Sequence, residues 1–173
     1  MVFDLEKFGR LVQYVCHQAP QEKFGAVKLN KVLWISEKYW YDKYGETVTG
    51  EVFIRKPQGP VASHMLQVRD TLERGGRVKI GKSKPQKGEE LESTVFHSKH
   101  KPDMNDFPAE FVAAVDVFLQ AICNEHTSQT ISVKTHDWLW RETADGQPMS
   151  FAAYYRNEDI TAAEQAWADS CSL

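Results

Sequence analysis

The stretch that decides the fold covers residues 28–61 and reads KLNKVLWISEKYWYDKYGETVTGEVFIRKPQGPV. Its first half carries apolar side chains at three- and four-residue intervals, which predicts an amphipathic helix with one buried face. Tyr44-Gly45 should end that helix, because glycine readily adopts the positive φ of a helix C-terminus. Residues 48–56 then have the β-branched and aromatic content of a strand. Gly59 and Pro60 predict a tight turn that leads into the next helix.

The rest of the chain supplies more helices around a small sheet. We expect further helices over residues 4–17, 61–75, 108–125, 128–137 and 161–170. Residues 77–101 alternate apolar and charged side chains around a turn rich in Gly, Lys and Pro, which predicts a β-hairpin. With the strand at residues 48–56, this hairpin would make one antiparallel sheet of about three strands. The predicted fold is therefore α+β, a mainly helical single domain over residues 1–173.

Composition places the chain among folded proteins of one domain. Its 173 residues are 42% hydrophobic and 26% charged, close to the globular average. The formal net charge of −3 gives no overall attraction to nucleic acids or anionic membranes. Cys16, Cys123 and Cys171 are far apart and odd in number, which favours reduced thiols. The first residues lack a secretion signal and no stretch is apolar enough to span a bilayer, so we expect a cytoplasmic protein without a membrane partner.

Residues that often catalyse reactions or bind metals do not converge in this sequence. His97 and His100 lie on a predicted strand, where positions three apart point to opposite faces. Cys16 and His17 are neighbours on a predicted helix and face about 100° apart, which argues against a nucleophile–base pair. No glycine-rich loop lies between a strand and a helix as a phosphate-binding loop must. We therefore expect no enzyme activity, no metal and no cofactor, and a function exerted by binding.

A run of basic residues without acidic neighbours coincides with the predicted hairpin. It consists of Arg74, Arg77, Lys79, Lys82, Lys84 and Lys87. A basic β-ribbon can lie along nucleic-acid phosphates or enter a groove. Lysines also protect sheet edges against aggregation, and the run lacks the interleaved aromatic residues of a base-stacking surface. Nucleic-acid binding, edge protection and an acidic protein partner are all open at this point.

The chain also contains a series of short motifs with a characteristic order and spacing. They are Lys28-Leu29-Asn30-Lys31-Val32-Leu33-Trp34, Tyr44-Gly45, Val48-Thr49-Gly50, Phe53, Gly59-Pro60-Val61, and Thr135-His136 with Trp138 and Trp140. Together they resemble the SocA-like, or Panacea, antitoxin domain of bacteria and their phages, over residues 5–155. The pattern departs from the family at Gln58, where an aromatic residue is frequent. The motif positions expected to be structural are Lys28, Leu29, Tyr44, Gly45, Gly50, Gly59, Pro60 and His136.

The resemblance implies an antitoxin that binds its cognate toxin protein and blocks it without chemistry of its own. At least one member of the family acts as an adaptor that presents its toxin to a protease, so a protease such as ClpXP is a further implied partner. Two alternatives of other classes stay open. One is a regulator that binds nucleic acid through residues 74–87, and the other is a hydrolase with convergent groups in a polar cleft.

An inhibitory interface usually depends on a few aromatic and arginine anchors within about 1,200–2,000 Å² of contact. The candidate partner-binding residues are Trp34, Tyr41, Arg55, Trp138 and Trp140. Indole rings are also common in protein cores, so the two later tryptophans are either exposed anchors or core residues. For His136 we expect a hydrogen bond to a backbone carbonyl in the turn around Gln58 and Gly59.

Overall fold

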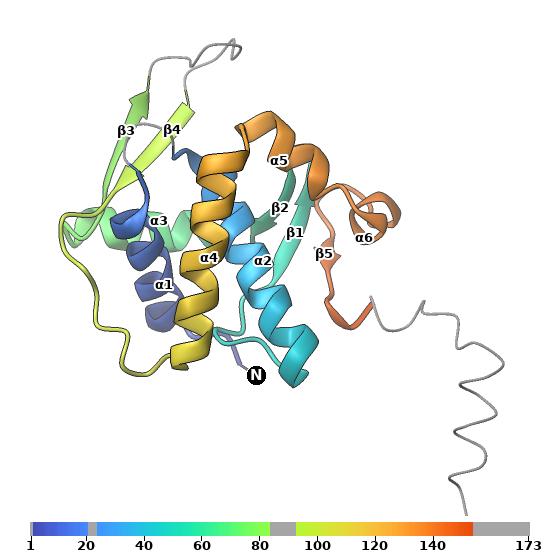
Figure 1. The fold of residues 1–173 in the computed structure, drawn as a ribbon, viewed down its shortest axis with the longest axis horizontal. Helices are drawn as coiled ribbons and strands as arrows, with labels where there is room; N and C mark the ends of the chain where they lie inside the picture. Colours follow the sequence, from blue (N-terminus) through green and yellow to red (C-terminus); the bar gives the residue numbers. More distant parts are fainter. Residues whose placement is uncertain (1, 21–23, 84–92, 154–173) are drawn as a thin grey trace, which may run out of the picture.

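The computed structural model describes residues 2–20, 24–83 and 93–153, and its fold is α+β. The helices are α1 (Leu5–Gln18), α2 (Ala26–Tyr44), α3 (Met65–Arg74), α4 (Ala109–Glu125), α5 (Ser128–Lys134) and α6 (Trp138–Glu142). The strands are β1 (Phe53–Lys56), β2 (Gly59–Ala62), β3 (Lys79–Ser83), β4 (Ser93–His97) and β5 (Pro148–Met149). Figure 1 shows α1, α2 and α4 in the centre, with β3 and β4 at the upper left and β1, β2 and β5 on the right. The predicted fold class is confirmed.

The long helices begin and end where the sequence indicates. Asp4 caps α1, because its side chain accepts a hydrogen bond from the Lys7 backbone N–H at 2.9 Å. α2 ends at Gly45, whose φ of 74° is left-handed and whose N–H donates to the Tyr41 carbonyl. α4 begins directly after Pro108, which suits the start of a helix. Local sequence signals therefore suffice for these three elements.

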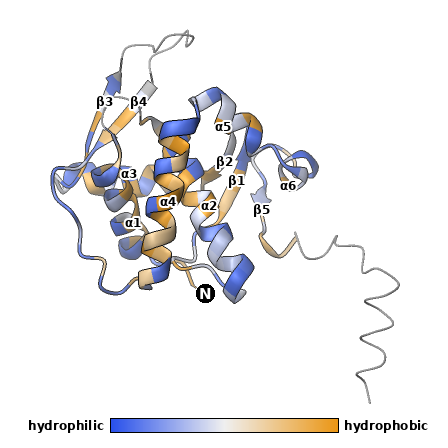
Figure 2. Cartoon of the chain, in the orientation of Figure 1, coloured by the Kyte–Doolittle hydropathy of each residue, from blue (hydrophilic) through white to orange (hydrophobic). Residues whose placement is uncertain are grey.

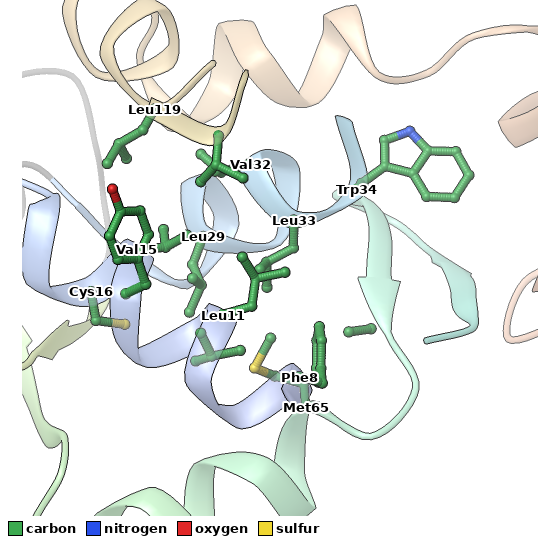
Figure 3. Packing of buried hydrophobic residues seen from close by; sticks show 14 of the residues in the cluster. Phe8, Leu11, Val15, Cys16, Leu29, Val32, Leu33, Trp34, Met65 and Leu119 are labelled. Atoms are coloured by element: carbon green, nitrogen blue, oxygen red, sulfur yellow. The ribbon is translucent and has the colours of Figure 1, made fainter. Parts of the chain in front are cut away.

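Apolar side chains of the central helices form the core. Figure 3 shows Leu11 and Val15 of α1 with Leu29 and Leu33 of α2, and Leu119 of α4 beside them. In Figure 2 the apolar colours gather on the central helices, whereas α6 is mainly hydrophilic. Among the helices of the described ranges, none combines the length and the apolar character that crossing a bilayer requires.

The first sheet has the strand order β2-β1-β5, and it corrects the prediction made for Gly59 and Pro60. These two residues lie in β2, where they pair with Lys56 and Arg55, and the tight turn is at residues 57–58. Proline fits here because β2 is an edge strand, where a missing backbone donor is tolerated. The helix expected from residue 61 consequently begins later, as α3.

β1 starts at Phe53 instead of Val48, because a buried carboxylate takes the backbone donors of the preceding segment. The Val48 and Thr49 N–H groups donate to the Glu37 carboxylate at 2.7 Å and 3.1 Å. Burial raises the pKa of Glu37, although these hydrogen bonds act in the opposite direction. A helix side chain thus satisfies donors that a strand partner would otherwise satisfy.

The predicted hairpin forms, but it makes a sheet of its own. β3 and β4 pair in register from Lys79 with His97 to Ser83 with Ser93. Its link to the helices includes an isolated bridge between Gly25 and Val95, and β1 is not its neighbour. The prediction of one sheet that joins the hairpin to residues 48–56 is therefore wrong, and β5 supplies the third strand beside β1.

The last described helices are shorter than the single helix predicted over residues 128–137. Thr127 caps α5, in a capping box with Thr130. Asp137 caps α6 by accepting the Trp140 backbone N–H at 3.0 Å. The helix predicted over residues 161–170 lies outside the described residues.

Candidate functional site

The turn between β1 and β2 is held by side chains from two helices. The Gln58 carbonyl accepts hydrogen bonds from Lys31 Nζ of α2 at 2.5 Å and from Ser132 Oγ of α5 at 2.8 Å. Lys31 Nζ also lies 3.4 Å from the Pro60 carbonyl oxygen. Three segments that are far apart in the sequence therefore meet at one peptide group, and the turn has a fixed position against α2 and α5.

Position 59 favours glycine at the end of this turn, first through its backbone conformation and then through the side chains packed against it. Its φ is +102°, and a Cβ at this position would lie 2.2 Å from Lys31 Nζ and 2.9 Å from Thr135 Oγ1. Thr135 is itself fixed, because its hydroxyl donates to the Ser132 carbonyl at 2.9 Å. Glycine is needed both for the backbone conformation and for the close approach of the lysine.

Lys31 is a buried cation whose contacts are carbonyl oxygens. It is 1% exposed, and burial lowers the pKa of its amine to about 7. The ion pairs of the described ranges do not include Lys31. The amine therefore exchanges its proton near neutral pH, while the Gln58 and Pro60 carbonyls can accept hydrogen bonds from either form.

A three-membered stack lies beside the turn. The Trp140 ring is sandwiched between the His136 ring, at a centroid distance of 3.6 Å and an angle of 8°, and the Arg55 guanidinium, at 4.1 Å. Trp140 Nε1 donates to the Lys56 carbonyl at 3.0 Å. The stack joins β1 to α6 and fixes the indole on both faces and at its only donor.

His136 was predicted to hydrogen-bond a backbone carbonyl around Gln58 and Gly59. Its backbone partner is instead Pro57, one residue before Gln58. Its ring is hydrogen-bonded to the Pro57 backbone, which has only a carbonyl to offer. The pKa of His136 is lowered, first by burial and then by the positive charges of Lys31 and Arg55. A neutral imidazole is therefore favoured in the stack.

We call the surface formed by residues 55–59 and 132–145 the turn surface. Figure 1 shows α5 and α6 at the right-hand end of the molecule, next to β1 and β5. Two large apolar side chains are exposed here: Val133 at 65% and Trp138 at 37%. Tryptophan and arginine are enriched among the residues that contribute most to binding at protein interfaces, and this surface carries both.

The predicted anchors divide into surface and core residues. Arg55 and Trp140 form the stack, and Trp138 is exposed on α6. Tyr41 is half-buried, with its ring 5.6 Å from that of Phe151. Trp34 is 2% exposed and packs on Phe53 and Phe151, so the structure places it in the core and away from any surface contact.

The motif residues are mostly structural in their placement. Leu29 is in the core, Lys28 and Pro60 are buried, and Gly45 ends α2. Gly50 has a φ of +73°, and a Cβ there would lie 2.6 Å from the Val2 carbonyl oxygen. Tyr44 is exposed, stacks on Trp40 and donates to Glu110 at 2.6 Å.

The basic residues do not converge on one face within the described ranges. Arg77 donates to Glu6 at 2.6 Å, and Arg74 lies in the last turn of α3. Lys79 and Lys82 are exposed on β3, but positions three apart in a strand point to opposite faces. Lys84 and Lys87 lie outside the described residues.

Groups that would serve catalysis or metal binding are separate from the turn surface. Burial raises the pKa of the Cys16 and Cys123 thiols, which keeps them protonated. Cys123 lines a small hollow together with Gln18, Pro20, Asp116, Leu119, Gln120 and Asn124. In the part of the chain that the structure describes, no three His, Cys, Asp or Glu side chains are grouped as metal ligands.

Three contributors to the turn surface were missed in the sequence. Lys31 stood in the quoted motif, but nothing local indicated that its amine is buried against a turn 27 residues later. Ser132 and Asp145 carry no motif at all, and their roles follow from long-range contacts. The sequence did indicate Arg55, Gly59, His136, Trp138 and Trp140, through their place in the motifs or their anchor chemistry.

The chain matches the family model described as the antitoxin SocA-like, Panacea domain, over residues 29–141. This range is more than half of the 173 residues, and it contains Lys31, Gly59, His136 and Trp140. The resemblance predicted from the motifs is confirmed. No curated protein and no solved structure matches the chain.

Proposed function

The chain belongs to the SocA-like, Panacea antitoxin domain family, and from this premise we propose that it neutralises a toxin protein by direct contact. The contact is made through the turn surface, with Trp138, Val133 and the Arg55–Trp140 stack as its anchors. The chain acts by occupying a surface of the toxin and makes or breaks no covalent bond. It is an antitoxin by binding alone.

The rigidity of the turn surface supports this proposal. Hydrogen bonds from Lys31 and Ser132 fix the turn, and the stack fixes Trp140 and Arg55. Anchors that are already ordered lose little conformational entropy on binding, which favours affinity. Trp138, the exposed tryptophan of the described residues, adds a large apolar area that a partner can cover.

The proposal is tested by co-expression with the product of the adjacent open reading frame. We expect the wild-type chain to restore growth and to co-purify with that protein. Trp138→Ala should weaken binding by tenfold or more, as truncation of a central aromatic anchor does. Leu66→Ala on α3 is the matched control, because Leu66 is also a large exposed apolar residue and lies on another helix. Equal binding by both variants contradicts the assignment of the turn surface, and absence of any rescue contradicts the antitoxin proposal.

Direct neutralisation is separated from an adaptor role by whether growth is rescued in cells that lack ClpXP. If binding alone suffices, rescue persists in cells that lack ClpXP, and the toxin accumulates in a stable complex. If the chain acts as an adaptor, rescue disappears in those cells and the toxin level rises. We expect the first outcome, because the fixed turn surface suits a stable interface.

A further inference from the structure

Arg55 is held in place mainly by Trp140 and by its own backbone. Its Nε donates to the Trp140 carbonyl at 3.0 Å, and its guanidinium lies 4.1 Å above the ring of the same residue. The backbone is fixed as well, because the Arg55 N–H donates to the Gln147 carbonyl at 2.9 Å. The side chain is thus oriented before any partner arrives.

The Nη groups of the Arg55 guanidinium are hydrogen-bond donors that a partner could use. An arginine has five N–H donors, and among the described residues only Nε of Arg55 makes a hydrogen bond. The nearest carboxylate is that of Asp145, 3.5 Å from Nη1. Charge-assisted hydrogen bonds are about 2.7–2.9 Å long, so this ion pair is loose.

Asp145 marks where a carboxylate can approach Arg55. It lies on an exposed turn that is fixed to β1, since the N–H of Gly146, φ 76°, donates to the Arg55 carbonyl at 2.9 Å. The turn surface also carries the exposed cations Lys56, Lys134 and Arg141. With Arg55 the turn surface holds four cations and three carboxylates. Its net charge is therefore positive, whereas the formal net charge of the whole chain is −3.

We propose that Arg55 binds a carboxylate on the toxin, an aspartate or glutamate side chain, through a bidentate pair of hydrogen bonds. This inference rests on the proposed function and adds the chemistry of the partner at the same surface. The fork of an arginine matches a carboxylate in geometry, and an arginine stacked on an indole is already oriented for it. Among the described residues the Nη groups of Arg55 donate no hydrogen bond, and the side chain is 22% exposed, so a partner carboxylate can reach them beside Asp145.

A protein carboxylate fits this surface better than a nucleic-acid phosphate. Both faces of the Trp140 ring are covered, by His136 and by Arg55, so the ring offers no face on which a base can stack. Asp137, Glu142 and Asp145 interrupt the cations of the turn surface, so the surface offers no continuous row of positive charges along which a phosphate backbone could lie. One carboxylate needs only the single fork that Arg55 provides.

The test uses the toxin that co-purifies with the wild-type chain. Calorimetry at two salt concentrations compares the affinities of four variants for that toxin. Arg55→Gln should weaken binding by tenfold or more, and Arg55→Lys by an intermediate factor, because lysine keeps the charge but not the fork. Asp145→Asn should bind at least as tightly as wild type. Arg69→Gln is the matched control, because Arg69 is paired with a neighbouring aspartate on α3 and should leave affinity within twofold.

Thermal unfolding of each variant separates lost binding from lost folding. If Arg55→Gln binds as well as wild type, or if Asp145→Asn weakens binding as much as Arg55→Gln, the inference is overturned, because Arg55 then serves only the chain's own structure. Direct neutralisation still stands in that case, since the wild-type complex exists. If the wild-type chain binds no toxin, the proposed function itself fails.

A carbodiimide cross-link gives a second, independent reading. The reagent joins a carboxylate to a nearby amine as an amide, and Lys56 and Lys134 are the exposed amines of the turn surface. We expect amides between Lys56 or Lys134 and an acidic residue of the toxin, identified by mass spectrometry and lost in Arg55→Gln. Cross-links confined to Lys79 or Lys82 contradict the inference. So does binding of single- or double-stranded DNA or RNA that depends on Arg55.

Discussion

The turn surface and the β3–β4 hairpin each contain a pair of antiparallel strands, but they are held in different ways. In the turn surface, the Gln58 carbonyl accepts hydrogen bonds from side chains of α2 and α5. The stack of His136 on Trp140 fixes a third helix, α6, at the same place. The hairpin carries exposed lysines, and its links to the rest of the fold include the buried Phe96 and an isolated bridge between Gly25 and Val95. Where residues far apart in sequence converge on one peptide group, changes should be costly. Where charges face the solvent, changes should be mild.

The largest difference between the two regions should appear at their glycines. Gly59→Ala must relieve a contact of 2.2 Å with Lys31 at a φ of +102°, and we expect it to lower the free energy of unfolding by about 3 kcal/mol or more. Gly76, before the hairpin, has a φ of +65° with nothing within 4 Å of an added Cβ. Gly76→Ala should cost only about 1 kcal/mol. Urea unfolding measures both, and equal costs would remove the distinction.

The buried amine of Lys31 should make the free energy of unfolding depend on pH, whereas the exposed lysines of the hairpin should not. The pKa of Lys31 is about 7 in the folded chain and 10.5 for a free lysine, so above pH 7 the unfolded chain binds a proton that the folded chain does not. Stability from this group therefore rises as pH increases from about 7 to 10.5, by up to about 1.4 kcal/mol per pH unit.

Lys31→Met should lack this slope, whereas Lys79→Met should keep it. The measurement is the unfolding free energy of wild type and both variants at several pH values between 6 and 10, in which other titrating groups cancel in the differences. Parallel curves for wild type and Lys31→Met would show that the amine stays protonated in the fold.

A smaller loss is expected for the ring that stacks on Trp140. His136→Ala removes the stack and the hydrogen bond to the Pro57 carbonyl, and we expect a loss of about 1–2 kcal/mol. His100, exposed after β4, is the matched control, and His100→Ala should change stability by less than about 0.5 kcal/mol. Unchanged thermal stability together with unchanged toxin binding in His136→Ala would leave this residue without a role.

The smallest effect should come from the hairpin lysines. Lys79→Ala with Lys82→Ala removes two exposed charges on opposite faces of β3, and stability should stay within about 0.5 kcal/mol of wild type. Affinity for the toxin should also be unchanged within twofold. A tenfold loss of affinity, or a salt-dependent loss of nucleic-acid binding, would give the hairpin the role assigned here to the turn surface.

The elements that the sequence predicted well are those specified by neighbouring residues. The Gly45 stop and the bounds of α1 and α4 follow from local signals, and the structure confirms them to within one residue. The family motifs predicted the relationship correctly for a similar reason, because short patterns in fixed order are readable without tertiary contacts.

The elements that the sequence predicted poorly depend on partners far along the chain. Pro60 becomes a strand residue because it pairs with Arg55 at a sheet edge, and Val48 stays out of the strand because Glu37 takes its N–H. α6 has five residues, too few for a helical period to show. Trp34 is of a residue type that is common among interface anchors. Its place in the core follows from its packing on Phe53 and Phe151, which the local sequence does not reveal.

The most direct test of the account is hydroxyl-radical footprinting of the chain alone and in complex with its toxin. Trp138 on the turn surface and Tyr44 at the end of α2 are both exposed aromatic residues, so each is oxidised readily in the free chain. We predict that the toxin protects Trp138 at least fivefold and leaves Tyr44 unchanged. Full oxidation of Trp138 in a complex that still neutralises the toxin would contradict the claim that the turn surface is the binding site.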